Sequence, residues 1–241
     1  MKSRAIVLHS LRYGDSSLVV EVYTEELGRR TLMVHVSRSR RSSTKPSLFQ
    51  PLSLLQLEVE PRATSDMLRP KNIGQEHVLS SLPYEPDKAA IGLFIAEFLY
   101  RALKAEGQHV DLFRFLHHSI VYLDECRTGY ANFHIVFLAH LSRFLGFYPN
   151  LDDYAEGYCF DLSAACFTPL LPREHSHYIG PDESRIMFNL MRLSYATMHL
   201  FPMNRTERAR CLKLMDEYYR LHLPEYPEIK SLEVLQQVFD H

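Results

Sequence analysis

Residues 4–45 read RAIVLHSLRYGDSSLVVEVYTEELGRRTLMVHVSRSRRSSTK. Three runs of β type cover residues 5–11, 17–23 and 29–36. In the second run Leu18, Val20 and Val22 alternate with more polar neighbours, which is the pattern of a strand that buries one face. Gly14 and Gly28 fall in the two connections, where a tight turn needs backbone freedom. The stretch predicts three consecutive strands.

The β pattern continues beyond a basic loop at residues 37–47. A further run covers residues 48–59, and Pro61, Pro70, Gly74 and Pro83 then punctuate a less regular region. Several short strands joined by turns over about 80 residues are typical of a small barrel or sandwich. A five-stranded OB-type barrel fits this size, although periodicity alone does not separate it from an SH3-like barrel.

The hydrophobic period becomes helical after Pro86. Apolar stripes predict helices at 87–105, 111–126, 130–146, 183–200, 205–222 and 231–239. We expect Asp87 and Asp111 to act as N-caps, and Asn204 with Glu207 to form a capping box. Residues 149–181 interrupt the helices with an irregular insert. The predicted fold is α+β with two domains, an OB-fold barrel at 1–80 and a helical bundle at 81–241.

The charge of the chain is divided unevenly between these two parts. The net charge is −2 over 241 residues, but residues 1–80 carry 12 Lys/Arg against 8 Asp/Glu, and residues 81–241 carry 15 against 21. No apolar run is long enough to span a bilayer, and the N-terminus is a poor signal peptide. A cytoplasmic location is therefore expected, with nucleoid association if the basic part binds nucleic acid. The four cysteines form no CxxC pair, and we expect reduced thiols.

A cluster of basic residues lies along the third strand and the loop that follows it. On a small barrel these groups would line one edge and bind a nucleic-acid backbone. The alternative is a solvated loop that only keeps the protein soluble. Tyr13 and Tyr23 could stack on bases or pack in the core, and we favour the core for at least one of them. The predicted nucleic-acid-binding residues are Arg12, Arg29, Arg30, Arg38, Arg40, Arg41 and Lys45.

The sequence contains weak candidates for a metal site. Cys159 and Cys166 lie seven positions apart, and His175 and His177 form an H-x-H, but the tight CxxC that usually starts a zinc site is missing. We therefore favour a metal-free insert, held by Tyr158, Phe160, Leu162 and Phe167. The other histidines lie scattered, and there is no HExxH, P-loop or GxSxG motif. We expect no catalytic residue and no cofactor.

The two ends of the chain resemble the RecO family of recombination mediators. At the start, the resemblance rests on the AIVL strand at residues 5–8, the YGD turn at 13–15 and the TEELG turn at 24–28. At the other end, YYRLHLPEYPEIKSLEVLQQVF at 218–239 is similar to RecO C-termini. The β-then-α order between the two ends agrees with the family. Many members carry a four-cysteine zinc motif in the insert, and this sequence departs from that pattern.

The resemblance implies an N-terminal OB fold, a helical C-terminal domain and no enzymatic activity. It also implies binding to single- and double-stranded DNA, annealing of complementary strands, and contact with the C-terminal tail of single-strand-binding protein. RecR, and possibly RecF, are the implied partners in loading recombinase. Three alternatives remain open from the residues: a protein-interaction adaptor that never touches DNA, an RNA-binding OB-fold factor, and a metal-dependent enzyme that uses the Cys/His residues.

Overall fold

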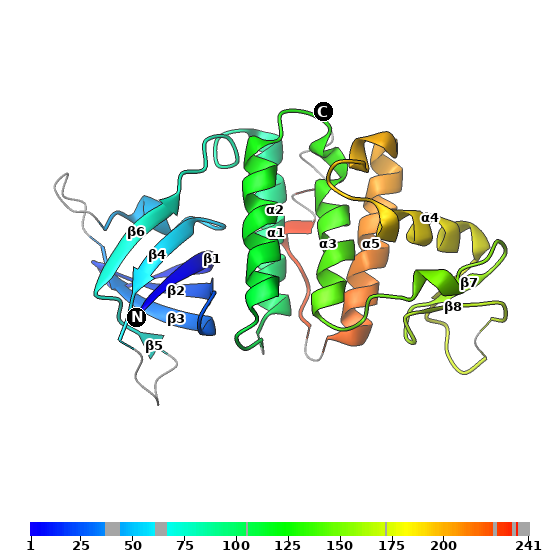
Figure 1. The fold of residues 1–241 in the computed structure, drawn as a ribbon, viewed down its shortest axis with the longest axis horizontal. Coiled ribbons are helices and arrows are strands. Elements are labelled where there is room, and N and C mark those ends of the chain that lie inside the picture. The colour runs from blue at the N-terminus through cyan, green and yellow to red at the C-terminus, as the bar shows by residue number, and fades with distance from the viewer. Residues whose placement is uncertain are drawn as a thin grey trace. The chain divides into compact units, whose positions relative to one another are not determined.

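The computed structural model describes residues 1–36, 44–60, 67–104, 106–171, 173–223, 226–232 and 235 (Figure 1). The chain divides into two compact units. The first contains Met1–Glu125 together with Glu228–His241, and the second contains Cys126–Pro227. Two helices therefore belong with the strands in the first unit, and the chain returns to that unit after completing the second.

Six strands of the first unit form one sheet in the order β5-β3-β2-β1-β4-β6. β1, β2 and β3 form an antiparallel meander, β4 pairs with the other edge of β1, and β5 runs parallel to β3. β5 and β6 lie at opposite ends of this order, yet only residues 69–71 separate them, so the chain itself links the two edges of the sheet. This is the partly open arrangement of an OB-type barrel. The strands are β1 (Lys2–Tyr13), β2 (Ser17–Thr24), β3 (Gly28–His35), β4 (Leu54–Glu58), β5 (Met67–Leu68) and β6 (Asn72–His77).

The predicted meander is confirmed, and so is the α+β class. Alternate residues of each strand enter the barrel core, where they pack with Phe49. The predicted run at 48–59 is wrong in its first half, because Pro46–Phe49 forms a 3-10 turn, η1, and β4 begins only at Leu54. Pro46 at the start of that turn and Pro51 after it both lack the amide that a strand ladder needs. The core residues are Ala5, Val7, Leu18, Val20, Val22, Leu32, Val34, Phe49, Leu55, Leu57, Val59 and Leu68.

Helices α1 (Pro86–Ala102) and α2 (Val110–Glu125) complete the first unit. The turn between β2 and β3 packs directly on the connection between these helices. An ideal Cβ on Gly28 would lie 2.3 Å from the carbonyl carbon of Gly107, so only a glycine allows this approach. The hydroxyl of the fully buried Tyr23 donates to the Gly107 carbonyl at 3.0 Å. These contacts fix the barrel to the helices within the unit.

A buried polar cluster fixes the segment that leads from β6 to α1. One Asp124 oxygen, at the end of α2, accepts the backbone N–H of Ser80 at 2.9 Å, and the other accepts those of Ser81 at 2.8 Å and Leu82 at 2.7 Å. The fully buried Lys88 donates to the Asp124 carbonyl at 3.0 Å. Burial opposes ionisation of Asp124, but the three N–H donors outweigh it and hold the pKa of this carboxyl below its ordinary value.

The chain returns to the first unit after residue 227 and packs against α1. Both oxygens of Glu97 accept backbone N–H groups, from Lys230 at 3.2 Å and from Ser231 at 2.8 Å. Ile229 and Leu235 are buried to 3% and 2% exposure. Ser231, Leu232 and Leu235 are helical, and the remainder of the predicted helix at 231–239 lies outside the described residues.

The second unit contains three helices and a small sheet. Its helices are α3 (Phe133–Phe144), α4 (Pro181–Arg192) and α5 (Arg205–His222), with η2 (Tyr130–Asn132), η3 (Leu151–Asp153) and η4 (Met198–Leu200) as 3-10 turns. The predicted irregular insert contains three short strands, β7 (Cys159–Asp161), β8 (Cys166–Thr168) and β9 (Tyr178–Ile179), in the order β8-β7-β9. The predicted helix at 183–200 ends early, because Leu193 adopts an extended conformation after Arg192.

One of the three predicted caps is confirmed. Asn204 and Glu207 form the capping box of α5, with bonds of 3.0 Å and 2.7 Å. Asp87 does not cap α1, because that helix begins one residue earlier with Pro86 at its first position. In α2 the Nδ1 of His109 accepts the N–H of Leu112 at 3.1 Å, so a histidine takes the role expected of Asp111.

We expect Gly28→Ala to lower the free energy of unfolding by about 3 kcal/mol, because the new methyl group meets backbone and the left-handed conformation is strained. Gly14→Ala is the matched control: Gly14 has the same φ of +68° but no described atom within 4 Å of the new Cβ. It should cost about 1 kcal/mol. Urea unfolding of both variants measures the difference, and equal losses would show that the Gly28 contact is not a packing constraint.

Asp124→Asn should lower stability at pH 7 by about 2 kcal/mol, because the amide has one acceptor oxygen for three donors. A carboxyl with a depressed folded pKa stabilises above its unfolded pKa, and this contribution is lost as pH falls through the folded value. The gap between wild type and Asp124→Asn should therefore narrow below about pH 4. Glu125→Gln, at the neighbouring exposed position, removes the same charge and should show no such trend.

Candidate nucleic-acid interface

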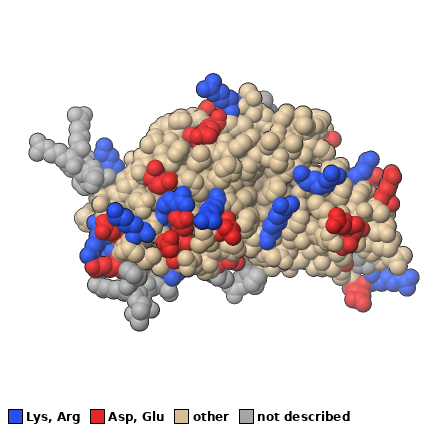
Figure 2. Space-filling view, viewed as in Figure 1, with Lys and Arg blue, Asp and Glu red and all other residues tan. Residues whose placement is uncertain are grey.

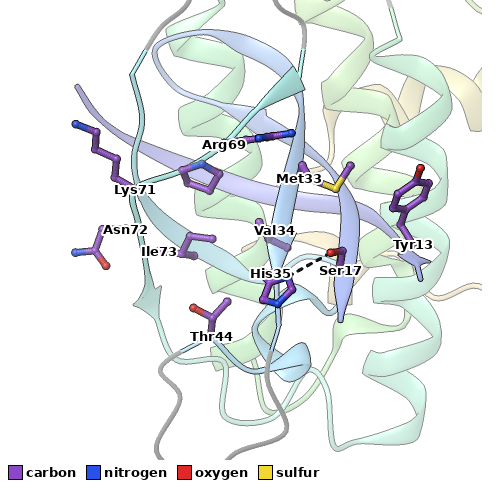
Figure 3. Close-up of a pocket in the computed structure, with 11 residues that line it drawn as sticks. Tyr13, Ser17, Met33, Val34, His35, Thr44, Arg69, Lys71, Asn72 and Ile73 are labelled. Atoms are coloured by element: carbon purple, nitrogen blue, oxygen red, sulfur yellow. Dashed lines mark hydrogen bonds between the residues drawn. The ribbon is translucent and has the colours of Figure 1, made fainter. Parts of the chain in front are cut away.

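An open groove crosses the outer face of the barrel at the end of β3 (Figure 3). Its volume is about 580 Å³, which is in the range of ligand-binding clefts. Apolar, aromatic, amide, hydroxyl and basic groups all contribute to its surface. The lining residues are Tyr13, Ser17, Met33, Val34, His35, Thr44, Arg69, Pro70, Lys71, Asn72 and Ile73.

The groove exists because one stretch of chain supplies the strands at both edges of the sheet, β5 and β6. β3 pairs with β5 only at Thr31 and Leu32, and the chain then leaves β3 and joins β4 from Asn72 onward. The end of β3 is therefore left between the segment at 69–73 on one side and Tyr13 on the other, as Figure 3 shows. Met33 and His35 alternate with the core residues Leu32 and Val34, so they face outward.

Four of the seven predicted contact residues lie among the described residues. Arg12 and Lys45 are exposed and form no ion pair with any described residue, and Arg30 is half-buried beside Arg29. The remaining three, Arg38, Arg40 and Arg41, lie outside the described residues. The last residue of β3, His35, and the first described residue beyond the gap, Thr44, both line the groove, so the described chain on both sides of the gap lies beside it.

Arg29 is engaged within the chain. Its side chain is only 13% exposed and pairs with Glu21 at 3.2 Å. One terminal nitrogen donates to the carbonyl of Tyr100 at 2.5 Å, and the guanidinium carbon lies 4.7 Å from the centre of that ring. Arg29 thus joins β3 to the end of α1. The nearby Arg4 is similarly engaged by Glu25 in a two-bond pair of 2.8 and 2.9 Å.

The groove contains two cations that the sequence reading missed. Arg69 is exposed and makes no hydrogen bond or ion pair with a described residue. Lys71 pairs with Glu60, but both side chains are more than half exposed, and such surface pairs contribute little, so a phosphate could replace the carboxylate. An Arg-Pro-Lys triplet after a β-type run was the available signal. The sequence alone does not show that the chain passes from β5 to β6 at this triplet, which is what places its two cations in the groove.

The two tyrosines considered for stacking have different environments. Tyr23 is fully buried and Tyr13 is 65% exposed. The expectation that at least one belongs to the core is confirmed for Tyr23. Tyr13, at the end of β1, presents its ring at the edge of the groove.

Basic and acidic side chains are interspersed on the face drawn in Figure 2. Within the first unit, Glu21 forms an ion pair with Arg29 and Glu25 forms one with Arg4. Binding of phosphates on this face would therefore depend on individual cations, either those with no acidic partner among the described residues or those, like Lys71, in an exposed pair that a phosphate can replace, because a general positive field does not cover that face.

The insert of the second unit is packed around aromatic rings. Phe160 and Phe167, opposite each other on β7 and β8, have ring centres 4.9 Å apart. Tyr154 stacks on Phe188 at 4.0 Å and meets Phe167 edge-on at 5.2 Å. Phe160, Leu162 and Phe167 are buried as expected, whereas Tyr158 is only half-buried.

The weak metal candidates do not converge in this insert. His175 pairs with Asp161 at 3.4 Å, and His177 pairs with Glu217 at 3.3 Å. Burial, together with the carboxylates of Asp161 and Asp153, raises the pKa of the Cys166 thiol, which disfavours the thiolate that a metal needs. In the part of the chain that the structure describes, no three His, Cys, Asp or Glu side chains form a group that could hold a metal ion.

The scattered histidines of the helices have structural surroundings. His134 is fully buried in α3, and burial lowers its pKa to about 3, so it is neutral at physiological pH. His117 of α2 lies 2.9 Å from Glu76 of β6 and connects the barrel to the helix within the first unit.

Because aromatic packing holds the insert, we expect EDTA to leave its thermal unfolding unchanged, and elemental analysis to find no stoichiometric zinc. Phe167→Ala should instead lower the free energy of unfolding by about 3–5 kcal/mol. One zinc per chain, removed by EDTA with a fall in the unfolding temperature, would contradict this account. Phe167→Leu, which keeps most of the buried volume, is the control.

Comparisons with known proteins cover nearly the whole chain. A family model described as "Recombination protein O N terminal" matches residues 1–72, and "Recombination protein O C terminal" matches residues 83–233. The DNA repair protein RecO of Bacteroides fragilis is 53% identical over 239 residues, which cover 99% of both chains. RecO of Phocaeicola vulgatus is 49% identical over 238 residues, 99% of this chain and 98% of that one. RecO of Porphyromonas gingivalis is 32% identical over 242 residues, again 99% and 98%.

Among the described residues, no helix combines the length and the apolar character needed to cross a bilayer.

Proposed function

Because the chain belongs to the RecO family of DNA repair proteins, we propose that its barrel binds the sugar-phosphate backbone of single- and double-stranded DNA. The contacts are assigned to Arg12, Arg30 and Lys45, and to Arg38, Arg40 and Arg41 of the loop. Arg69 and Lys71 join this set. Arg29 supports the barrel from within, since its guanidinium is already engaged.

The observation that supports this proposal best is the position of the loop's two ends. His35 and Thr44, the described residues nearest to the densest basic segment of the sequence that line a groove, line the same groove as Arg69 and Lys71. Each phosphate contact releases condensed counterions, which makes binding salt-dependent and tolerant of sequence. A protein that makes six to ten such contacts loses about 10³- to 10⁵-fold in affinity between roughly 50 and 200 mM salt.

DNA binding by the barrel agrees with the DNA repair role of the family. Cations that neutralise two strands lower the repulsion between them, so that complementary strands can pair while bound. We propose that the protein anneals strands in this way and, with RecR and possibly RecF, helps to load recombinase onto DNA covered by single-strand-binding protein. Contact with the C-terminal tail of that protein would bring it to such DNA.

The proposed role is one of a mediator with no chemical step of its own. Three of the histidines have structural surroundings: His175 and His177 pair with carboxylates, and the buried His134 is neutral at physiological pH. Strand annealing of complementary oligonucleotides coated with single-strand-binding protein tests the mediator role directly.

Replacing Arg38, Arg40 and Arg41 together by alanine should weaken binding to a labelled single-stranded oligonucleotide. Each lost phosphate contact reduces the slope of log affinity against log salt by about 0.7, so the slope should fall by up to about 2. Fluorescence anisotropy at several salt concentrations measures both quantities.

The charge-matched control replaces three exposed arginines of the second unit, Arg127, Arg173 and Arg185. It changes the net charge equally and should leave the slope unchanged. An unaltered slope in the loop variant would remove the loop from the interface, and equal losses in both variants would reduce the effect to net charge.

A further inference from the structure

We propose that the groove on the outer face of β3 holds one unpaired strand, with a base stacked on Tyr13 and the neighbouring backbone held by Arg69 and Lys71. The barrel would then bind single strands in a way that a duplex cannot reproduce. This inference rests on the proposed function and adds to it a ligand class and residues for one part of the surface.

The two sides of the groove differ in chemistry. On one side Tyr13 is 65% exposed, at the end of the exposed half of β1. On the other side Arg69 and Lys71 are exposed basic residues, while the outward-facing Met33 lies between the two sides (Figure 3). A nucleotide has the same division, with an aromatic base at one end and a charged phosphate at the other.

The groove offers hydrogen-bonding groups in addition. Asn72 is exposed on the same side as Lys71, and at the end of β3 Ser17 and His35 lie 3.4 Å apart between Oγ and Nδ1 (Figure 3). Mixed donors and acceptors can bind the edge of a base without requiring one particular base. The site is therefore suited to an unpaired strand of any sequence.

A duplex does not present the same features. Its bases are stacked on their neighbours and paired at their edges, so a base reaches the Tyr13 ring only after unpairing. The phosphates of a duplex remain available to Arg69 and Lys71. Stacking should consequently contribute to single-strand affinity alone, whereas the two cations should contribute to both forms.

The test uses the full-length protein, a labelled oligothymidine, the same strand with abasic positions, and a matched duplex. Tyr13→Ala should weaken oligothymidine binding about 10-fold, in the range known for one base stacked on one aromatic ring. Tyr13→Phe keeps the ring and should bind like wild type. Duplex binding and the salt slope should be unchanged in both variants, because no charge is removed.

The abasic strand gives a readout that loss of folding would not produce. It should bind wild type more weakly than oligothymidine does, and Tyr13→Ala should not distinguish the two strands. In the Arg69→Ala/Lys71→Ala variant we expect a salt slope reduced by about 1.4 on single strands, since two phosphate contacts are lost. Tyr13 lies outside the core, so thermal unfolding of Tyr13→Ala should match wild type.

Equal binding of oligothymidine by wild type and Tyr13→Ala, or equal losses on single strand and duplex, would overturn the groove assignment and leave the proposed function intact. A loss in Tyr13→Phe as large as that in Tyr13→Ala would overturn the stacking contact as well. Absence of salt-dependent binding of wild type to either form would contradict the proposed function itself, and the groove assignment with it.

Discussion

The structure of the barrel depends on one constraint: a single stretch of chain, residues 67–77, must pair with both edges of the same sheet. It runs parallel to β3 for two residue pairs and then pairs antiparallel with β4. Between the two pairings lies Pro70, which has no amide to donate to either neighbour. Arg69 and Lys71 flank this proline, so the crossing both opens the sheet and places two cations beside the opening.

The helices of the first unit restrict the opposite end of the barrel. Gly28 contacts the backbone of Gly107 so closely that no side chain fits, and Tyr23 and Arg29 add hydrogen bonds to the same region. There the Tyr23 hydroxyl and the Arg29 guanidinium connect the sheet to the helical part of the unit. The groove end has no such covering helix among the described residues. The contacts with the helices thus stabilise one end of the barrel, and the groove that we propose as the binding site lies at the other.

Local patterns predicted the β meander, the helical segments and the Asn204 capping box, because each depends on residues close in sequence. Such patterns did not predict which basic side chains are engaged within the chain and which line the groove. Arg29 lies 71 positions from the carbonyl that engages it, and Arg69 lines the groove because the chain crosses there from β5, which pairs with β3, to β6, which pairs with β4. Alternation identified the buried face of β2 but could not distinguish Tyr23, which enters the core, from Tyr13, which does not. Sequence similarity identified the family, whereas the groove became visible only in the three-dimensional structure.

The return of the chain to α1 has a consequence for biosynthesis. Ile229 and Leu235 are buried in the unit that begins at Met1, yet the ribosome makes them only after all of residues 126–227. A nascent chain that has emerged as far as Glu125 has its barrel and two helices but lacks the segment that Glu97 binds. The apolar surface beneath that segment stays uncovered until translation has passed the second unit, which exposes the emerging protein to premature association for that interval.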